Sequence, residues 1–378
     1  MVPKLRFNGF TIPWKQAQIG SILTIGSGRD YKHLAHGEVP VFGTGGLMTY
    51  VDEFLHDGET VCIGRKGTID NPFYYSGKIW TVDTLFFTHS FTKVLPKFVF
   101  SLFCNINWKE HNEASGVPSL SKSIIEKIEV FYPDLKEQTK IADFLTSVDE
   151  KITLLNKQYD LLCQYKKGMM QKIFSQEVRF KDEYGEEFPE WEESLLSERI
   201  KVQGGFAFKS QLFSEMASTK VLRIGDISEE IDLSAFSGVF STETPAIRYQ
   251  VNKGDFVMAL SGATFGKMGL IKCESAFLNQ RVATFRLLDN TTDILSFYYY
   301  YMSTMEFINY IKSIPTASAQ PNISNKDIEL YLSFIPTKKE QTKIANFLSA
   351  LDDKIAVKNA ELGKLKTWKQ GLLQQMFV

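Results

Sequence analysis

Two short segments place glycines and a basic side chain between runs of β-forming residues. The first is 63–69 (IGRKGTI) and the second is 260–269 (LSGATFGKMG), and they occupy matching places in the two halves of the chain. Glycine allows backbone amides to approach a phosphate closely, and arginine or lysine supplies positive charge. The recurrence favours loops that contact DNA, while a glycine hairpin with a solvated lysine stays the alternative for each loop alone.

Side chains near these loops could also contact bases, because arginine and glutamine make two-point contacts with guanine and adenine edges. Each of them alone also fits a solvated or structural residue. The candidates for phosphate or base contact are Arg65, Lys66 and Lys78 in the first half, and Lys209, Arg223, Lys267, Gln280 and Arg281 in the second.

Other candidate motifs lack the residue spacing or the residues that nucleotide binding, methyl transfer or metal binding would need. The glycine run 42–46 (FGTGG) does not match the GxGxxG pattern, and 262–267 (GATFGK) is one residue too short for a phosphate-binding P-loop. The segment 70–74 (DNPFY) lacks the second proline of an adenine-methyltransferase motif. His33 and His36 have no third ligand nearby. The sequence therefore predicts neither a catalytic site nor a metal site.

Composition limits the kind of DNA-binding surface that the chain can carry. The net charge is −1 over 378 residues, so a basic surface must be local, with acidic residues elsewhere. The four cysteines form no CxxC pair, which is typical of free thiols in a reducing cytoplasm. No signal peptide and no membrane-spanning run is visible.

The strongest feature is an internal duplication. Residues 136–174 align without gaps with 339–377, with 18 of 39 positions identical at an offset of 203. The similarity continues upstream, where Ser121 corresponds to Ser324, and a weaker similarity links Arg6 with Arg179 near the start of each half. The chain therefore has the order A–B–A′–B′, with diverged A segments and similar B segments.

Each B segment predicts one long helix. Neither contains proline, and Asp134 and a Thr337–Glu340 capping box are suitable starts. Apolar residues recur in alternating steps of four and three, which is a heptad pattern. About 39 residues at ~1.5 Å each span roughly 60 Å, and the apolar stripe must be buried, most simply against the other copy. The first stripe comprises Ile141, Leu145, Val148, Ile152, Leu155, Tyr159, Leu162, Met169 and Ile173, and the second Ile344, Leu348, Leu351, Ile355, Leu362, Leu365, Leu372 and Met376.

The A segments alternate short β-forming runs, such as 59–63 and 255–259, with glycine and with helical stretches at their ends. This pattern predicts an α+β fold: two α/β domains, each with a twisted sheet, joined by two long antiparallel coiled-coil helices in a pseudo-twofold duplication. The predicted boundaries are 1–133 for the first domain, 134–177 for the central helix, 178–336 for the second domain and 337–378 for the C-terminal helix.

The whole chain resembles the specificity subunits of type I restriction-modification systems. The resemblance rests on Pro118-Ser-Leu-Ser121 followed by 137–145 (EQTKIADFL), and on Pro321-Asn-Ile-Ser324 followed by 340–348 (EQTKIANFL). It implies a non-catalytic subunit whose two domains are target-recognition domains. Each recognises one half of a split, asymmetric site in double-stranded DNA, and the length of the helices sets the gap between the halves. The divergence of the A segments would then reflect two different half-sites, and the similarity of the B segments would reflect docking of the same partner.

The resemblance also implies partners. Two methyltransferase (modification) subunits would dock on the helices, and motor–nuclease (restriction) subunits would join for cleavage. S-adenosylmethionine, ATP and Mg²⁺ would bind those partners, so no cofactor is expected on this chain. Adenine methylation would require the base to be flipped into the partner's pocket.

Two other classes of function stay open. A stand-alone methyltransferase would need a methyl-donor loop and a catalytic motif, and methylation by the purified chain alone would reveal one. A coiled-coil adaptor without DNA contact would account for the helices but not for two diverged domains with paired glycine–cation loops. A gel shift in the presence of the partner distinguishes this adaptor from a DNA-binding subunit.

Overall fold

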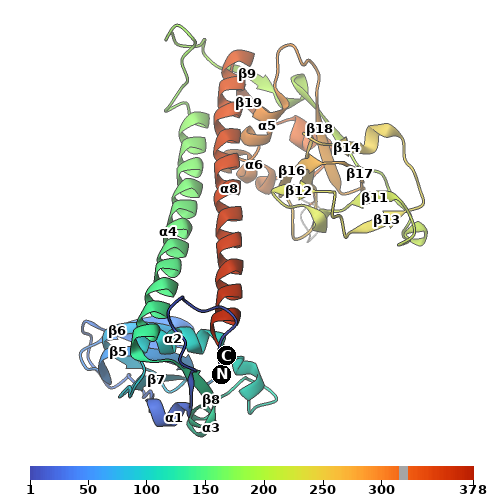
Figure 1. Ribbon diagram of the computed structural model, residues 1–378. Helices are drawn as coiled ribbons and strands as arrows, with labels where there is room; N and C mark the ends of the chain where they lie inside the picture. The colour runs from blue at the N-terminus through green and yellow to red at the C-terminus, as the bar shows by residue number, and fades with distance from the viewer. Residues whose placement is uncertain (315–321) are drawn as a thin grey trace. The chain divides into compact units, whose positions relative to one another are not determined.

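The computed structural model describes residues 1–314 and 322–378, so Pro321 of the second sequence motif lies outside the described residues (Figure 1). The chain divides into two compact units. Unit 1 comprises Met1–Tyr159 and Val357–Val378, and unit 2 comprises Asp160–Ala356. Each long helix therefore contributes residues to both units. Among the described residues, no helix is both long enough and apolar enough to cross a lipid bilayer.

Unit 1 is built on a six-stranded sheet. Its spatial order is β2 (Thr24–Ser27), β7 (Leu85–His89), β5 (His56–Gly64), β6 (Phe73–Thr81), β3 (Val39–Gly43) and β4 (Gly46–Val51). Neighbours are antiparallel except β3 and β6, which are parallel. Helix α2 (Pro96–Asn105) packs against β5 and β6, and buried aromatic residues such as Phe98 and Phe103 join it to the core.

Unit 2 repeats this topology despite its different sequence. The order is β10 (Ile200–Gly204), β18 (Val282–Leu287), β15 (Phe256–Ala259), β16 (Met268–Cys273) and β12 (Glu230–Asp232). Neighbours are again antiparallel except the last pair. Each strand thus corresponds to one in unit 1, but among the described residues of unit 2 no strand follows β12 in the place of β4. The predicted mixed fold with a sheet in each domain is confirmed.

Unit 2 also contains a second sheet that has no counterpart in unit 1. Its order is β13 (Val239–Ser241), β11 (Thr219–Leu222), β17 (Ser275–Leu278) and β14 (Gln250–Asn252). The helices α5 (Leu295–Tyr301) and α6 (Met305–Ser313) follow β18 and supply much of the aromatic core, including Phe297 and Phe307.

A small antiparallel pair of strands closes each domain beside the start of its long helix. The pairs are β1 (Lys15–Gln18) with β8 (Glu129–Tyr132), and β9 (Glu192–Leu195) with β19 (Leu332–Ile335). Short helices adjoin these strands: α1 (Ile19–Ile22) follows β1, α3 (Lys122–Lys127) precedes β8, and α7 (Asn325–Glu329) precedes β19. Ser121 and Ser324 cap α3 and α7 by accepting hydrogen bonds from the backbone, which explains the serine that both motifs contain.

The long helices are α4 (Leu135–Phe174) and α8 (Lys338–Met376). All residues of both predicted apolar stripes are buried or half-buried, which confirms the heptad pattern. Asp134 caps α4, because its Oδ1 accepts a 3.0 Å hydrogen bond from the amide of Glu137. The Thr337–Glu340 capping box is wrong: the Glu340 carboxylate instead accepts hydrogen bonds from Arg179 and Trp191.

The first turn of each long helix is joined to its own domain by a buried ion pair. Glu137, 1% exposed, accepts hydrogen bonds of 2.6 and 2.7 Å from the guanidinium of Arg6. Glu340, 0% exposed, accepts bonds of 3.2 and 2.8 Å from Arg179. These pairs raise the pKa of both arginines above the ordinary value. They also explain the weak similarity around Arg6 and Arg179 in the sequence.

The next residue of each helix, Gln138 or Gln341, is also buried and polar. Gln138 accepts a 2.8 Å hydrogen bond from the amide of Leu95, and Gln341 accepts one of 2.9 Å from the amide of Ile294. Each side-chain amide also donates to the carbonyl of the proline five residues earlier. The glutamine in both sequence copies therefore fixes the segment before α2 or α5 against the helix.

The two long helices pack against each other within each unit. In unit 1, Lys369 of α8 forms a 2.5 Å ion pair with Asp149 of α4. In unit 2, Lys166 of α4 forms an equivalent 2.5 Å pair with Asp352 of α8. The end of one helix thus lies beside the first half of the other, which is an antiparallel arrangement. The heptad spacing of the two stripes falls on a lysine at three positions, 166, 358 and 369. Lys166 and Lys369 form these ion pairs between the helices, and Lys358 pairs with Glu361 of its own helix at 3.0 Å.

The ends of the long helices complete the cores. The Phe377 ring, just after α8, lies 6.0 Å from Trp14 and 5.4 Å from Phe98 of unit 1, measured between centroids. The Phe174 ring at the end of α4 lies 6.5 Å from Trp191 and 5.8 Å from Phe297 of unit 2. Each helix therefore starts in the core of one unit and ends in the core of the other.

The four cysteines are free thiols, as predicted. Burial raises the pKa of Cys104 to about 11 and raises the pKa of Cys62 further still. A thiol with a raised pKa is a poor nucleophile at neutral pH, so both residues contribute packing rather than reactivity.

Candidate nucleic-acid interface

The two glycine–cation loops connect equivalent strands. The loop 65–72 joins β5 to β6, and the loop 260–267 joins β15 to β16. In unit 1, the carbonyl of Arg65 accepts a 2.9 Å hydrogen bond from the amide of Leu120, and in unit 2 that of Leu260 accepts one of 3.1 Å from Ile323. Leu120 and Ile323 are the third residues of the duplicated motifs. The prediction that the loops occupy matching places is confirmed.

Two of the three candidate cations of unit 1, Arg65 and Lys66, lie beside the start of α3. Arg65 is half-exposed; its guanidinium donates a 3.3 Å hydrogen bond to the carbonyl of Asp83 and lies 5.9 Å from the Phe86 ring centroid. Lys66 is exposed and forms no ion pair with any described residue. Together with Lys122 they line a hollow of about 320 Å³ whose one acidic residue is Glu113. This hollow has the charge and the hydroxyl groups that a phosphate requires.

Lys122 was missed in the sequence analysis. It follows Ser121 of the duplicated motif directly, so its position next to a helix cap was the available signal. Lys78, by contrast, is not brought to this group. Lys78 lies on β6 opposite Asp57, near the start of β5, whereas Arg65 directly follows the end of β5. The Lys78 ammonium group lies 5.1 Å from the Phe54 ring centroid.

The candidates of unit 2 border the loop 260–267. The carbonyl of Arg281 accepts a 2.9 Å hydrogen bond from the amide of Leu260, which opens the loop. Arg281 also donates a 3.0 Å hydrogen bond to the side chain of Asn322. The loop in turn reaches the segment after β11, because Thr264 Oγ1 donates to the carbonyl of Ile224 at 3.0 Å. Arg223 and Gln280 flank these contacts, and the Arg223 guanidinium lies 3.5 Å from the Asp226 carboxylate.

Lys267 and Lys209 lie at the margins of the same region. Lys267 is exposed at the foot of the loop, where its amide donates to Thr264 and its carbonyl accepts from Ala259, both at 2.9 Å. Lys209 is also exposed and follows Phe206, whose amide donates to Leu278 at the end of β17. The structure therefore collects all five candidates of unit 2 around the ends of β11, β15 and β17.

The individual cations do not correspond between the units. Lys66 bridges to Ser119, and the equivalent bridge in unit 2 joins Ser261 to Asn322, so a serine occupies the place of Lys66. Arg281 instead occupies the place of Thr84, whose carbonyl accepts a 2.7 Å hydrogen bond from the amide of Arg65. Positive charge is thus present at the same place in both units but comes from different strands.

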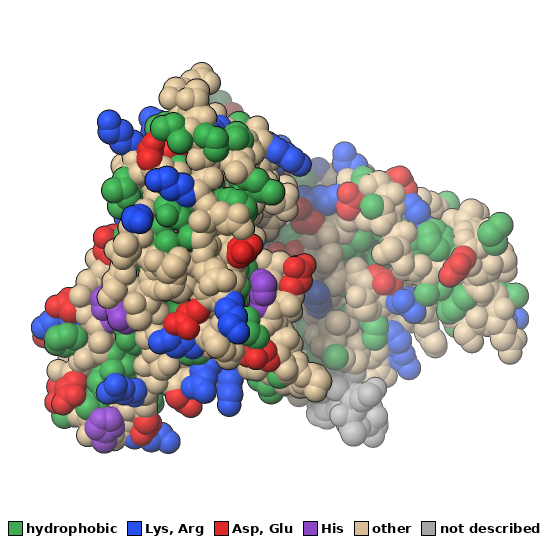
Figure 2. All heavy atoms as spheres, turned by 60° about the horizontal axis from the view of Figure 1, so that its bottom comes forward, with side chains coloured by type: hydrophobic (Ala, Val, Ile, Leu, Met, Phe, Trp, Pro, Cys, Tyr) green, Lys and Arg blue, Asp and Glu red, His purple; other side chains and the backbone are tan. Residues whose placement is uncertain are grey.

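The molecular surface carries charge of both signs (Figure 2). Figure 2 shows basic side chains interspersed with acidic ones on the face that it displays, as the net charge of −1 requires. Within residues 1–314 and 322–378, no three His, Cys, Asp or Glu side chains are grouped as a metal ion would need. The features that stand out are therefore the basic loops.

Comparisons with known proteins agree with this geometry. The family model for the type I restriction modification DNA specificity domain matches residues 11–163 and 189–367. The specificity subunit of the type I restriction enzyme MjaVIII from Methanocaldococcus jannaschii is 30% identical over 279 residues, which are 70% of this chain and 65% of that protein. The putative MjaX specificity subunit of the same organism is 25% identical over 68% of this chain and 60% of its own length. The matched region thus spans less than two thirds of either relative.

Solved structures show the same fold. The crystal structure of the S subunit of a type I restriction-modification system from M. genitalium superimposes with a TM-score of 0.67 at 17% identity, covering 100% of this chain and 99% of that one. A chain from a structure of type I complex assembly gives a TM-score of 0.57 at 14% identity. Since the family model matches most of the residues, once in each half, the chain belongs to the family of type I restriction-modification DNA specificity domains.

Proposed function

We propose that this chain is the sequence-recognising, non-catalytic subunit of a type I restriction-modification complex. Each unit would bind one half of a split, asymmetric site in double-stranded DNA. The observation that carries the proposal is the pair of equivalent loops after β5 and β15, which hold basic side chains on the same topology in two domains of different sequence. Two domains that recognise different sequences need the same frame and different contact residues, which is this pattern.

The catalytic steps would belong to partners. Two modification subunits would methylate adenine, and motor–nuclease subunits would cleave DNA, in the cytoplasm where these systems act. S-adenosylmethionine, ATP and Mg²⁺ would be bound by those subunits. The names of the relatives, which are specificity subunits of type I enzymes, support this division of roles. That helix length sets the spacing between half-sites stays a prediction.

A methylation map tests the proposal. The full chain is produced together with its modification subunit in a host that has no such system, and methylated adenines are mapped across the genome. A single split, asymmetric motif is expected, and it should vanish when the chain is omitted. Methylation by the chain alone would favour a stand-alone methyltransferase. A chain that forms the complex with its modification subunit but does not bind DNA in a gel shift would favour an adaptor. Either result would overturn the proposal.

The basic loops make a separate prediction about salt dependence. Replacing Lys267 by alanine should weaken binding to all duplexes by a similar factor and reduce the slope of log K against log salt by about 0.9 for one lost phosphate contact. Lys66→Ala should do the same in unit 1. Lys253 is the matched control, because it is equally exposed but precedes β15, at the end of the strand away from the loop. An unchanged slope for Lys267→Ala would remove this residue from the interface.

A further inference from the structure

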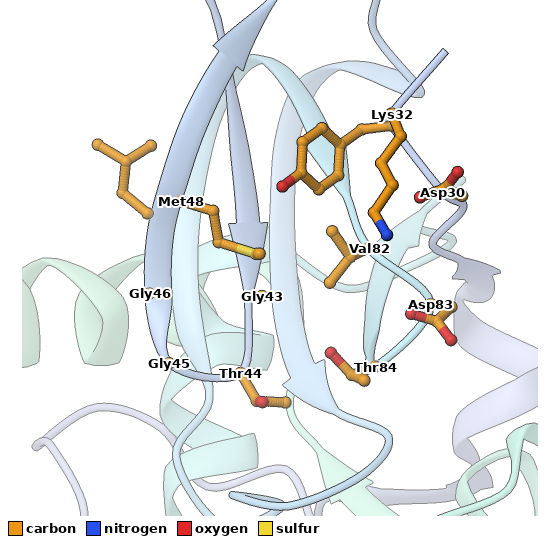
Figure 3. A pocket seen from close by; sticks show the side chains of 12 residues that line it. Asp30, Lys32, Gly43, Thr44, Gly45, Gly46, Met48, Val82, Asp83 and Thr84 are labelled. Carbon is orange, nitrogen blue, oxygen red and sulfur yellow. The ribbon is translucent and has the colours of Figure 1, made fainter. Parts of the chain in front are cut away.

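A pocket of about 520 Å³ opens in unit 1 beside the basic loop. Figure 3 shows its two unlike walls. Met48 reaches in from the β3–β4 hairpin towards Val82, while Asp30, Lys32 and Asp83 stand on the other side. The hydroxyl groups of Thr44 and Thr84 lie near its lower end in that view. The glycine run 42–46, which matches no nucleotide-binding motif, forms the turn of this hairpin.

The hairpin wall exposes apolar side chains at a turn that is kept free of bulk. Leu47 is 50% exposed and Met48 is 53% exposed. Gly46 adopts a φ of +107°, and a Cβ atom on it or on Gly45 would meet no atom within 4 Å. The positive φ explains why position 46 is a glycine. Gly45 has no such backbone requirement, and the space around it is open. An unfilled turn that carries two exposed apolar side chains is suited to the close approach of another molecule.

The opposite wall holds two carboxylates that form no ion pair with a described residue, although Lys32 lies on the same wall (Figure 3). Asp30 and Asp83 are exposed, and neither side chain forms an ion pair or hydrogen bond with residues 1–314 or 322–378. A carboxylate beside a DNA backbone opposes binding, because it repels phosphate. It gains a favourable contact only where it meets an amine, as on the exposed edge of cytosine or adenine. Both residues therefore suit the recognition of bases rather than affinity in general.

The pocket adjoins the basic loop directly. The carbonyl of Thr84 accepts hydrogen bonds from the amides of Arg65 and Lys66, at 2.7 and 3.3 Å. The carbonyl of Asp83 is held by the Arg65 guanidinium. A Cβ on Gly67 would lie 3.7 Å from Thr44 Oγ1, so the hairpin turn and the loop are in contact. A duplex with a phosphate on Arg65 or Lys66 would thus present its groove to this pocket.

We infer that this pocket recognises an A·T base pair from the major groove. The Asp83 carboxylate accepts a hydrogen bond from the adenine N6 amine, and Met48 with Leu47 contacts the thymine methyl group. Among the four base pairs, only A·T and T·A combine an amine donor with a methyl group on this edge. The inference rests on the proposed function and deepens it for unit 1. Unit 2 would recognise its half-site differently, because no described strand there corresponds to β4.

The first test uses Asp83→Ala, which removes both acceptor oxygens; asparagine is unsuitable because its amide itself pairs with adenine N6 and N7. In the full chain with its modification subunit, the preference for an A·T pair at one position of one half-site should fall about tenfold, a typical value for a lost base contact. The other half-site should stay unchanged. Binding to a duplex without the site should become tighter, since a repulsive charge is gone. Glu53→Ala is the control, because Glu53 is also an exposed carboxylate of unit 1 but lies outside the pocket.

The second test changes the DNA and not the protein. Replacing the thymine of that pair by deoxyuridine removes only the methyl group, and wild-type affinity should fall about fourfold, the effect of one buried methyl group. Met48→Ala should distinguish the two duplexes less than the wild type does, because Leu47 alone then contacts the methyl group.

The outcomes separate this inference from the function on which it rests. A wild-type chain that yields a split motif, while Asp83→Ala keeps its base preference and deoxyuridine costs no affinity, would overturn the A·T pocket and leave the proposed function intact. A wild-type chain that yields no motif would overturn both. Because the deoxyuridine test needs no variant, misfolding of a mutant cannot decide the result.

Discussion

Replacing Glu340 by alanine is expected to lower the free energy of unfolding of unit 2 by about 3–5 kcal/mol. The carboxylate is completely buried and accepts hydrogen bonds from Arg179 at 3.2 and 2.8 Å and from Trp191 at 3.2 Å. Alanine would leave the guanidinium, whose side chain is 19% exposed, with only the distant carboxylate of the exposed Glu190, at 3.8 Å. A charge that loses its partner in such surroundings costs more than the pair contributed. Hydrogen exchange of the β15 and β18 amides measures the loss in unit 2 alone.

Two variants sharpen this experiment. Replacing both Arg179 and Glu340 by methionine should recover much of the loss, since neither charge then stays buried. Glu193→Ala, a change of an exposed carboxylate in the same unit, should cost less than about 0.5 kcal/mol. If Glu340→Ala were as mild as Glu193→Ala, the ion pair would have no role in joining α8 to its domain.

The buried Glu-Gln pair shows where the sequence could be interpreted and where it could not. The duplication and the helices follow from periodicity, and the structure confirms both. The sequence does not show why the starts of the two helices are so similar, because it does not distinguish a buried polar residue from an exposed one. Docking of a common partner was the expectation; Glu137 and Gln138, at 1% and 0% exposure, supply a structural reason for identity at their positions. Exposed identities such as Lys151 with Lys354 stay available for a partner.

The candidate interface was predictable in its loops but not in its residues. Glycines between β-forming runs indicated 63–69 and 260–269, and these loops are equivalent. The cations are not, because Ser261 takes the place of Lys66 and Arg281 that of Thr84. A surface can keep its charge while the charge moves to a neighbouring strand, and alignment of one sequence with itself cannot detect such a move. Nor could it place Lys122 beside Arg65, since 57 residues separate them in the chain and only the fold joins them.

The crossed helix ends lead to the second large effect. Replacing Phe377 by alanine should lower the free energy of unfolding of unit 1 by about 3–5 kcal/mol, the usual cost of removing a buried phenylalanine ring. Phe377 is 4% exposed and contacts Trp14 and Phe98, both far from it in the sequence. Val378→Ala, at a 40% exposed neighbour, is the control and should change little.

The equivalent change in α4 should act on the other unit. Phe174 packs on Trp191 and Phe297, so Phe174→Ala should reduce the hydrogen-exchange protection of the β15 amides in unit 2. The loss should be smaller than the loss that Phe377→Ala causes at the β5 amides in unit 1, because Phe174 is only half-buried. The location of the effect is specific: each terminal ring should be needed by the unit in which its helix ends. Protection lost only in the unit where the mutated helix begins would contradict the crossed arrangement. The two phenylalanines occupy the same position of the duplicated segment, so one sequence feature predicts opposite effects because each ring completes a different core.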